Sequence, residues 1–189
     1  MIAAIDTLPR PLQLPCFLAA LPRPLSIVAT DDVFSAQPAM GSRSPRIFLL
    51  SPGLSMSVVP EGAGRPLLEL GERTDDPSQS LKAEIHFPIL EPLSPDEPFT
   101  RIEDPSRQGT SCGVCHGLEH DLGGGRFASR ALQPAPFTLI GVEHLIEEAL
   151  GCDPLLEPDR CAMLEALFLS GQVDQASFPE GYDTIYDPR

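Results

Sequence analysis

Two cysteines and a histidine stand close together in the second half of the chain, with a spacing that suits several kinds of chemistry. Cys112 and Cys115 are three positions apart, and His116 follows directly. On a helical turn these side chains lie near one another, because residues three or four apart share a face. Two thiols and an imidazole in this order can bind a metal ion, cycle as a dithiol, or bond to the two vinyl groups of one porphyrin with the imidazole below its iron.

The order Cys-x-x-Cys-His also carries a family resemblance. It is the haem-attachment motif of c-type cytochromes, and residues 108–182 resemble a minimal monohaem c-type cytochrome in which the attachment turn precedes a pair of helices. The resemblance implies one covalent haem c, thioether bonds from Cys112 and Cys115, and His116 as proximal iron ligand. It implies single-electron transfer, or a haem-bearing subunit of a larger assembly, rather than catalysis. The first half of the chain resembles no family of known function.

The sixth iron ligand decides what such a site does, and the sequence offers two candidates for it. Met163 lies 47 residues after His116, but within a helical pattern of apolar residues, where a methionine more often belongs to the core. His144 lies on the polar side of its expected helix, where a solvated histidine is the simpler interpretation. His120 shares the helical face of His116, and His86 belongs to the other half of the chain. A haem without a distal ligand therefore remains an alternative.

The remaining cysteines allow a disulfide and also a reading without haem. Cys152 and Cys161 flank the turn between two expected helices, so they either pair, with a gain of about 2 to 3 kcal/mol, or stay as buried free thiols. Cys16 is then expected to be unpaired and buried. In the alternative function, the Cys-x-x-Cys-His residues and one of these thiols bind zinc, or the cysteines form disulfides in a structural or binding protein. The long spacing between Cys152 and Cys161 is unlike that of most zinc ligand pairs.

Proline and apolar periodicity divide the chain into parts. Of the 22 prolines, 16 precede residue 110, so we expect an extended, turn-rich first half and a helical second half. Short apolar runs bounded by Gly, Pro, Asp and Ser predict strands, and Pro52-Gly53 has the order that a type II turn requires. The last run alternates, which predicts one buried face and one wet face that carries Lys82, Glu84 and His86. The predicted strands are residues 26–30, 46–50, 54–59, 67–72 and 81–87.

Two helices are predicted after the attachment turn. Residues 141–150 place apolar side chains on one stripe, and residues 158–171 begin with a proline in the first turn and are apolar almost all round. The second of these should be a core helix. The fold class is therefore α+β, an antiparallel β meander or sandwich followed by a small helical cytochrome c-like module. The expected parts are a Pro-rich, extended strap (1–25), the β module (26–104) and the haem module (105–189).

Charge and compartment restrict the partners. The net charge of −14 argues against nucleic acid and suits a basic redox partner protein. No apolar run is long enough to span a membrane. Haem attachment through thioethers implies a periplasmic or extracellular location. Because the first 25 residues show no basic, apolar export signal, we expect that signal to have been removed or the start to be wrongly assigned.

Overall fold

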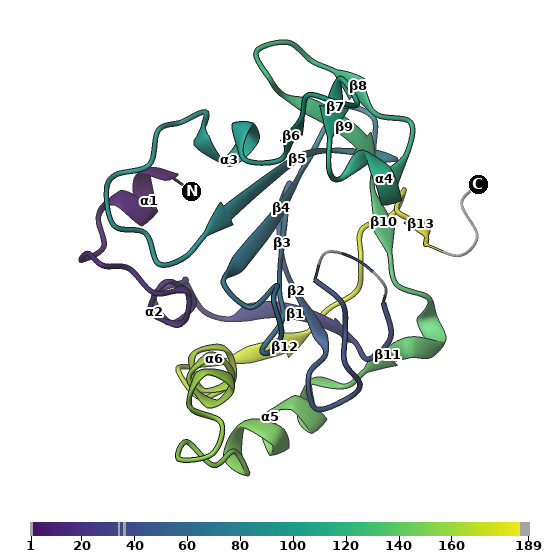
Figure 1. The fold of residues 1–189 in the computed structure, drawn as a ribbon. Helices are drawn as coiled ribbons and strands as arrows, with labels where there is room; N and C mark the ends of the chain where they lie inside the picture. Colours follow the sequence, from purple (N-terminus) through teal and green to yellow (C-terminus); the bar gives the residue numbers. More distant parts are fainter. Residues whose placement is uncertain (1, 34, 36, 186–189) are drawn as a thin grey trace.

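A nine-stranded sheet organises the part of the chain that the structure describes (Figure 1). This computed structural model describes residues 2–33, 35 and 37–185. Five successive strands form an antiparallel meander, in which each strand pairs with the next one along the chain. They are β1 (Leu25–Thr30), β2 (Arg46–Ser51), β3 (Leu54–Val58), β4 (Leu67–Arg73) and β5 (Gln79–His86).

Strands from the second half of the chain extend this sheet at both edges. β9 (Phe127–Arg130) pairs with β5, and β8 (His120–Asp121) pairs with β9. At the other edge, β1 pairs antiparallel with β11 (Leu139–Ile140) and parallel with β12 (Val173–Gln175). The chain on both sides of residue 104 therefore contributes to one sheet, and the described residues after 105 supply strands as well as helices.

The five strands predicted from alternation and turn residues are confirmed, each to within two residues at either end. The hairpin between β2 and β3 turns at Pro52-Gly53, where Gly53 has a φ of 80°. A positive φ at this position is what a type II turn requires, and glycine adopts it without steric cost.

The N-terminal segment differs from the extended strap that its prolines suggested. It forms two short helices, α1 (Ile2–Asp6) and α2 (Leu14–Ala19). Pro15 lies in the first turn of α2, where its missing N–H costs no helical hydrogen bond. Leu14, Phe17 and Leu18 are buried, so packing against the core overrides the local preference for an extended chain.

The apolar core lies on one face of the sheet, under helices α2, α5 (Val142–Leu150) and α6 (Pro158–Phe168). Both α5 and α6 match the predicted helices, and α6 is buried along most of its length, as its apolar composition predicts. The strands contribute alternate residues to this face, which pair across the sheet in register. These are Ile47, Leu49, Met56, Val58, Leu68, Leu70, Ala83 and Ile85.

The opposite face is covered by elements from the second half of the chain. These include its C-terminal segment, residues 176–185. Figure 1 places α4 (Gly113–His116), β10 (Leu132–Gln133) and β13 (Asp183–Thr184) on the side of the sheet away from α1, α2 and α6. The shorter elements α3 (Glu97–Thr100), β6 (Glu103–Asp104), β7 (Gly109–Thr110) and the 3-10 turn at Pro136–Thr138 connect these parts. Within the described ranges, no helix has the length and apolar character needed to cross a bilayer.

Candidate functional site

The Cys-x-x-Cys-His residues form a single helical turn on the polar side of the sheet. Cys112 precedes α4, and its carbonyl oxygen accepts hydrogen bonds from the backbone N–H groups of Cys115 and His116, at 3.2 and 3.0 Å. Both thiols are free. The motif therefore forms one helical turn, as its spacing predicts, but the two sulfurs and an imidazole nitrogen do not all lie within 4.8 Å of one another.

His116 is held to strand β9 at two points by Arg130. Its Nδ1 lies 2.7 Å from the backbone oxygen of Arg130, and the Arg130 Nε donates to the backbone oxygen of His116 at 2.8 Å. A carbonyl oxygen only accepts, so Nδ1 is the protonated ring nitrogen and Nε2 carries the free lone pair. This is the tautomer that binds a metal ion through Nε2.

Gly117, directly after the motif, allows the close approach of Arg130. It ends α4 with a φ of 59°, a conformation that favours glycine. A Cβ added there would lie 3.1 Å from the Arg130 Nη2. A side chain at this position would strain the backbone and push against the residue that orients His116.

Glu119 closes the loop on the other side of the turn. Its carboxylate accepts hydrogen bonds from the Thr110 backbone N–H at 2.7 Å and from the Thr110 hydroxyl at 2.5 Å. Cβ atoms built on Gly109 or Gly113 would come within 3 Å of the same carboxylate. Gly109 and Gly113 therefore leave room for the Glu119 carboxylate. Its hydrogen bonds to Thr110 join the segment before the motif to the segment after it.

A layer of buried polar side chains lies on the sheet face below the motif. Arg46 donates hydrogen bonds to Glu69 and Ser57, at 2.5 and 2.9 Å, and Lys82 donates to Ser80 and to the Arg130 backbone oxygen, at 2.6 and 3.1 Å. Lys82 and His116 Nδ1 therefore bond to the same carbonyl oxygen.

The prediction that Lys82 lies on a solvent-exposed face of β5 is therefore wrong. Lys82 is only 6% exposed, whereas His86 is exposed as predicted. Alternation places Lys82 on the face opposite the apolar core, but it does not reveal that α4 and the C-terminal segment cover that face.

Burial shifts the pKa values of three groups in this layer. Burial, and to a smaller extent Lys82, lowers the pKa of His116 to about 3. Burial, and next the charge of Glu69, raises the pKa of the Cys112 thiol to about 11. Burial also lowers the pKa of Lys82 to about 8. At neutral pH the imidazole is uncharged and the Cys112 thiol keeps its proton, while Lys82 is mostly charged.

The space beside the motif consists of two adjoining cavities of about 60 and 50 Å³. Arg46, Phe48, His116 and Leu132 line both cavities; Cys112 lines the first and Cys115 the second. Phe178 and Tyr182 of the C-terminal segment cover the first cavity, with their ring centroids 5.5 Å apart.

The donor set fits c-type haem attachment, because two free thiols on one helical turn precede an imidazole with a free Nε2. The space does not hold a porphyrin while the C-terminal segment lies in this position, since ligand pockets of that class measure about 300 to 1,000 Å³. The segment reaches the site through β13, which pairs with β10, and through a hydrogen bond of 2.8 Å from Gln133 to the Tyr182 backbone oxygen.

Neither predicted distal ligand lies beside His116. Met163 is 1% exposed and packs in the apolar core under the other face of the sheet. His144 lies on α5, and its Nε2 is buried without a hydrogen-bond partner among the described residues. Met56 borders the first cavity, but strand alternation directs its side chain into the core.

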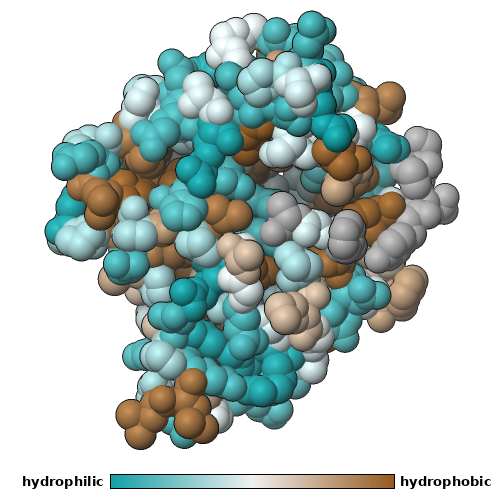
Figure 2. All heavy atoms as spheres, viewed as in Figure 1, coloured by the Kyte–Doolittle hydropathy of each residue, from teal (hydrophilic) through white to brown (hydrophobic). Residues whose placement is uncertain are grey.

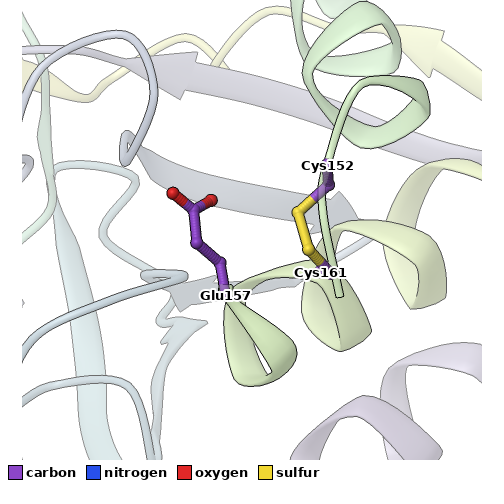
Figure 3. A group of neighbouring side chains, drawn as sticks. All are labelled: Cys152, Glu157 and Cys161. Carbon is purple, nitrogen blue, oxygen red and sulfur yellow. A yellow bond between two sulfur atoms is a disulfide. The ribbon is translucent and has the colours of Figure 1, made fainter. Parts of the chain in front are cut away.

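Cys152 and Cys161 form a disulfide that joins the end of α5 to α6 (Figure 3). Glu157 lies close enough for the three side chains to surround an ion. The bond occupies both sulfurs, however, and buried Arg160 makes ion pairs with Glu157 and Glu148 beside it. These cysteines therefore do not join Cys112 and Cys115 in one zinc site. Cys16 is a free and exposed thiol, contrary to the expectation that it is buried.

Comparison with protein-family models, with curated proteins and with solved structures found no match. The site therefore rests on its own geometry. Sequence reasoning found the motif but missed the residues that hold and surround it. The sequence signal for these residues was the alternation that places Lys82 on the face of β5 opposite the apolar core. The missed residues are Arg46, Glu69, Lys82 and Glu119.

Proposed function

We propose that this chain is a c-type haem protein in which Cys112 and Cys115 form the thioether bonds and His116 is the proximal ligand. The observation that carries the proposal is the hydrogen bond from His116 Nδ1 to the Arg130 backbone oxygen, 2.7 Å long. It leaves Nε2 free and fixes the ring plane, which is the role that a backbone carbonyl plays behind a metal-bound histidine.

The bound haem would supply single-electron transfer at its iron. The residues around the haem would hold the turn in place and set its electrostatic environment. Arg130 and Glu119 hold the attachment turn, and the positive charges of Arg46 and Lys82 favour the reduced state of a nearby redox group by stabilising added negative charge. The net charge of −14 favours a basic redox partner protein in the periplasm or outside the cell.

The proposal requires the C-terminal segment to be displaced when haem is attached. Phe178 and Tyr182 occupy the room beside His116, and β13 pairs with β10 over two residue pairs. We expect backbone amides 176–185 to exchange with deuterium faster in the haem-loaded protein than in the haem-free protein. Equal exchange rates in the two forms would contradict this requirement.

The test is production of the chain, fused to an export signal, in bacteria that contain periplasmic haem-attachment machinery. The expected product shows a Soret band that survives acid-acetone extraction, with one haem per chain. Cys112→Ser and Cys115→Ser should each give the spectrum of a singly attached haem, and the double variant should lose haem on extraction. Cys16→Ser is the matched control, because it removes a free thiol elsewhere and should keep the band.

A colourless wild-type product that contains one zinc ion per chain would overturn the proposal. Far-ultraviolet circular dichroism of each variant separates loss of the haem from loss of the fold.

A further inference from the structure

A separate cavity opens on the apolar face of the sheet. Its volume is far larger than that of either cavity beside His116. It measures about 510 Å³ and lies between the ends of β3, β4 and β5 on one side and helices α1 and α3 on the other. Figure 2 shows apolar residues gathered on the side of the molecule where Figure 1 places α1 and α3. The walls are mostly apolar and include Ile2, Leu54, Leu70, Leu81, Ala83 and Phe99.

One acidic residue interrupts the apolar floor. Leu54, Glu72 and Leu81 are direct neighbours across β3, β4 and β5, and they share the face of the next row, Met56, Leu70 and Ala83. The Glu72 side chain is exposed and, within the described ranges, has neither an ion pair nor a hydrogen bond. An unpaired carboxylate beside two leucines is suited to a cationic group that carries an apolar body.

Among the described residues, the neighbouring arginines make no ion pair with Glu72. Arg73 also borders the cavity, but alternation directs its side chain to the other face of β4. Arg126 stacks on the Phe99 ring at 5.0 Å from its centroid and pairs with Asp96 at 3.2 Å. The charge that faces the apolar walls is therefore negative.

We propose that this cleft binds small organic amines, with the ammonium group against Glu72 and the apolar body along Leu54, Leu81 and Phe99. The volume lies within the range of ligand pockets, about 300 to 1,000 Å³. The site lies on the face of the sheet away from the haem-attachment turn, so it is independent of the proposed haem.

The test compares three ligands with the same eight-carbon chain, namely octylamine, octanol and octanoate, by calorimetry at pH 7. We expect octylamine to bind about fivefold more tightly than octanol, the gain of one partly exposed ion pair, and octanoate to bind most weakly. Glu72→Gln should reduce octylamine to the affinity of octanol. Glu91→Gln, which removes an exposed carboxylate elsewhere, is the matched control and should leave the preference unchanged.

Two further variants test the location. Ala83→Phe fills the floor of the cleft, and Ala3→Trp narrows it from the exposed side of α1, so that one remains informative where the other does not fold. At least one folded variant should lose binding of all three ligands. The proposal is overturned if none of the ligands binds, if octanoate binds best, if Glu72→Gln leaves the amine preference intact, or if both folded variants bind normally.

Discussion

The two faces of the central sheet are both covered, but they are built from different chemistry. One face presents aliphatic residues to α2, α5 and α6, and it contains the largest fully buried side chains of the sheet, such as Ile47 and Leu68. The other presents Arg46, Glu69 and Lys82 to the Cys-x-x-Cys-His turn. Alternate residues of the same strands serve both faces.

The difference separates the part of the molecule that stabilises the fold from the part that holds a site. Burial of apolar surface stabilises at about 25 cal/mol per Å², whereas burial of charged groups roughly breaks even at best. A sheet that needed only stability would carry apolar side chains on both covered faces. The polar layer is therefore what the proposed function requires of the face that lies under His116.

The largest effect should come from the apolar face. Met163→Ala removes a fully buried side chain and should lower the free energy of unfolding by about 2 to 4 kcal/mol, measured by urea denaturation. Met163→Leu keeps the volume and should cost less than about 1.5 kcal/mol. Neither should change the spectrum of the reduced haem protein. A changed spectrum in the leucine variant would place Met163 on the iron and break the separation of the two faces.

A smaller loss is expected when the ion pair of the polar face is broken. Glu69→Gln leaves the buried Arg46 without its carboxylate and should cost about 1 to 3 kcal/mol. The matched control is Glu72→Gln on the same strand, which should change stability by less than about 0.5 kcal/mol because its side chain is exposed. The double variant Arg46→Met/Glu69→Leu should recover most of the loss. If it is less stable than Glu69→Gln, the pair contributes net stability and the comparison fails.

Lys82 should oppose stability at neutral pH. Its pKa in the folded protein, about 8, lies below the usual value of 10.5, so the unfolded chain binds more protons between these pH values. Stability of the wild type should therefore rise as the pH increases from 8 to 10.5.

Lys82→Met removes this dependence and should be about 1 to 3 kcal/mol more stable at pH 7, with the advantage shrinking across that interval. Lys82→Arg keeps the charge and should show no gain. A methionine variant that is less stable than the wild type at pH 7 would mean that the hydrogen bonds of Lys82 outweigh the cost of burying its charge.

The smallest effect should be local to the Cys-x-x-Cys-His turn. Gly117→Ala should cost about 1 to 2 kcal/mol, because of the positive φ and the contact with Arg130. Gly124→Ala is the control, since Gly124 has a similar φ of 66° but open space around it. The difference between the two variants measures the Arg130 contact together with the strain of an alanine at the Gly117 ψ of −179°. Equal costs would show that Arg130 can move away freely.

The sequence predicts the main strands and helices better than the long-range contacts that they make. The meander β1 to β5 and helices α5 and α6 follow from periodicity and from turn residues, which are local signals. The short strands β9, β11 and β12 have no alternation of their own and form only because the sheet offers them an edge. The prolines before residue 25 did not reveal helix α2, because its packing overrides their local preference.

The same limit applies to the site. The motif identifies Cys112, Cys115 and His116 without any structure, but Arg130 meets His116 only through the path of β9. Arg46 and Glu69 are 23 positions apart, so their pairing depends on the register of β2, β3 and β4. Long-range register is not visible in a single sequence.

The most direct measurement is the intact mass of the chain after production with haem-attachment machinery. The account predicts a mass increase equal to one haem, retained after denaturation and absent from the Cys112→Ser/Cys115→Ser variant. An unmodified mass for folded wild-type protein, produced beside a control cytochrome that is fully loaded, would contradict it.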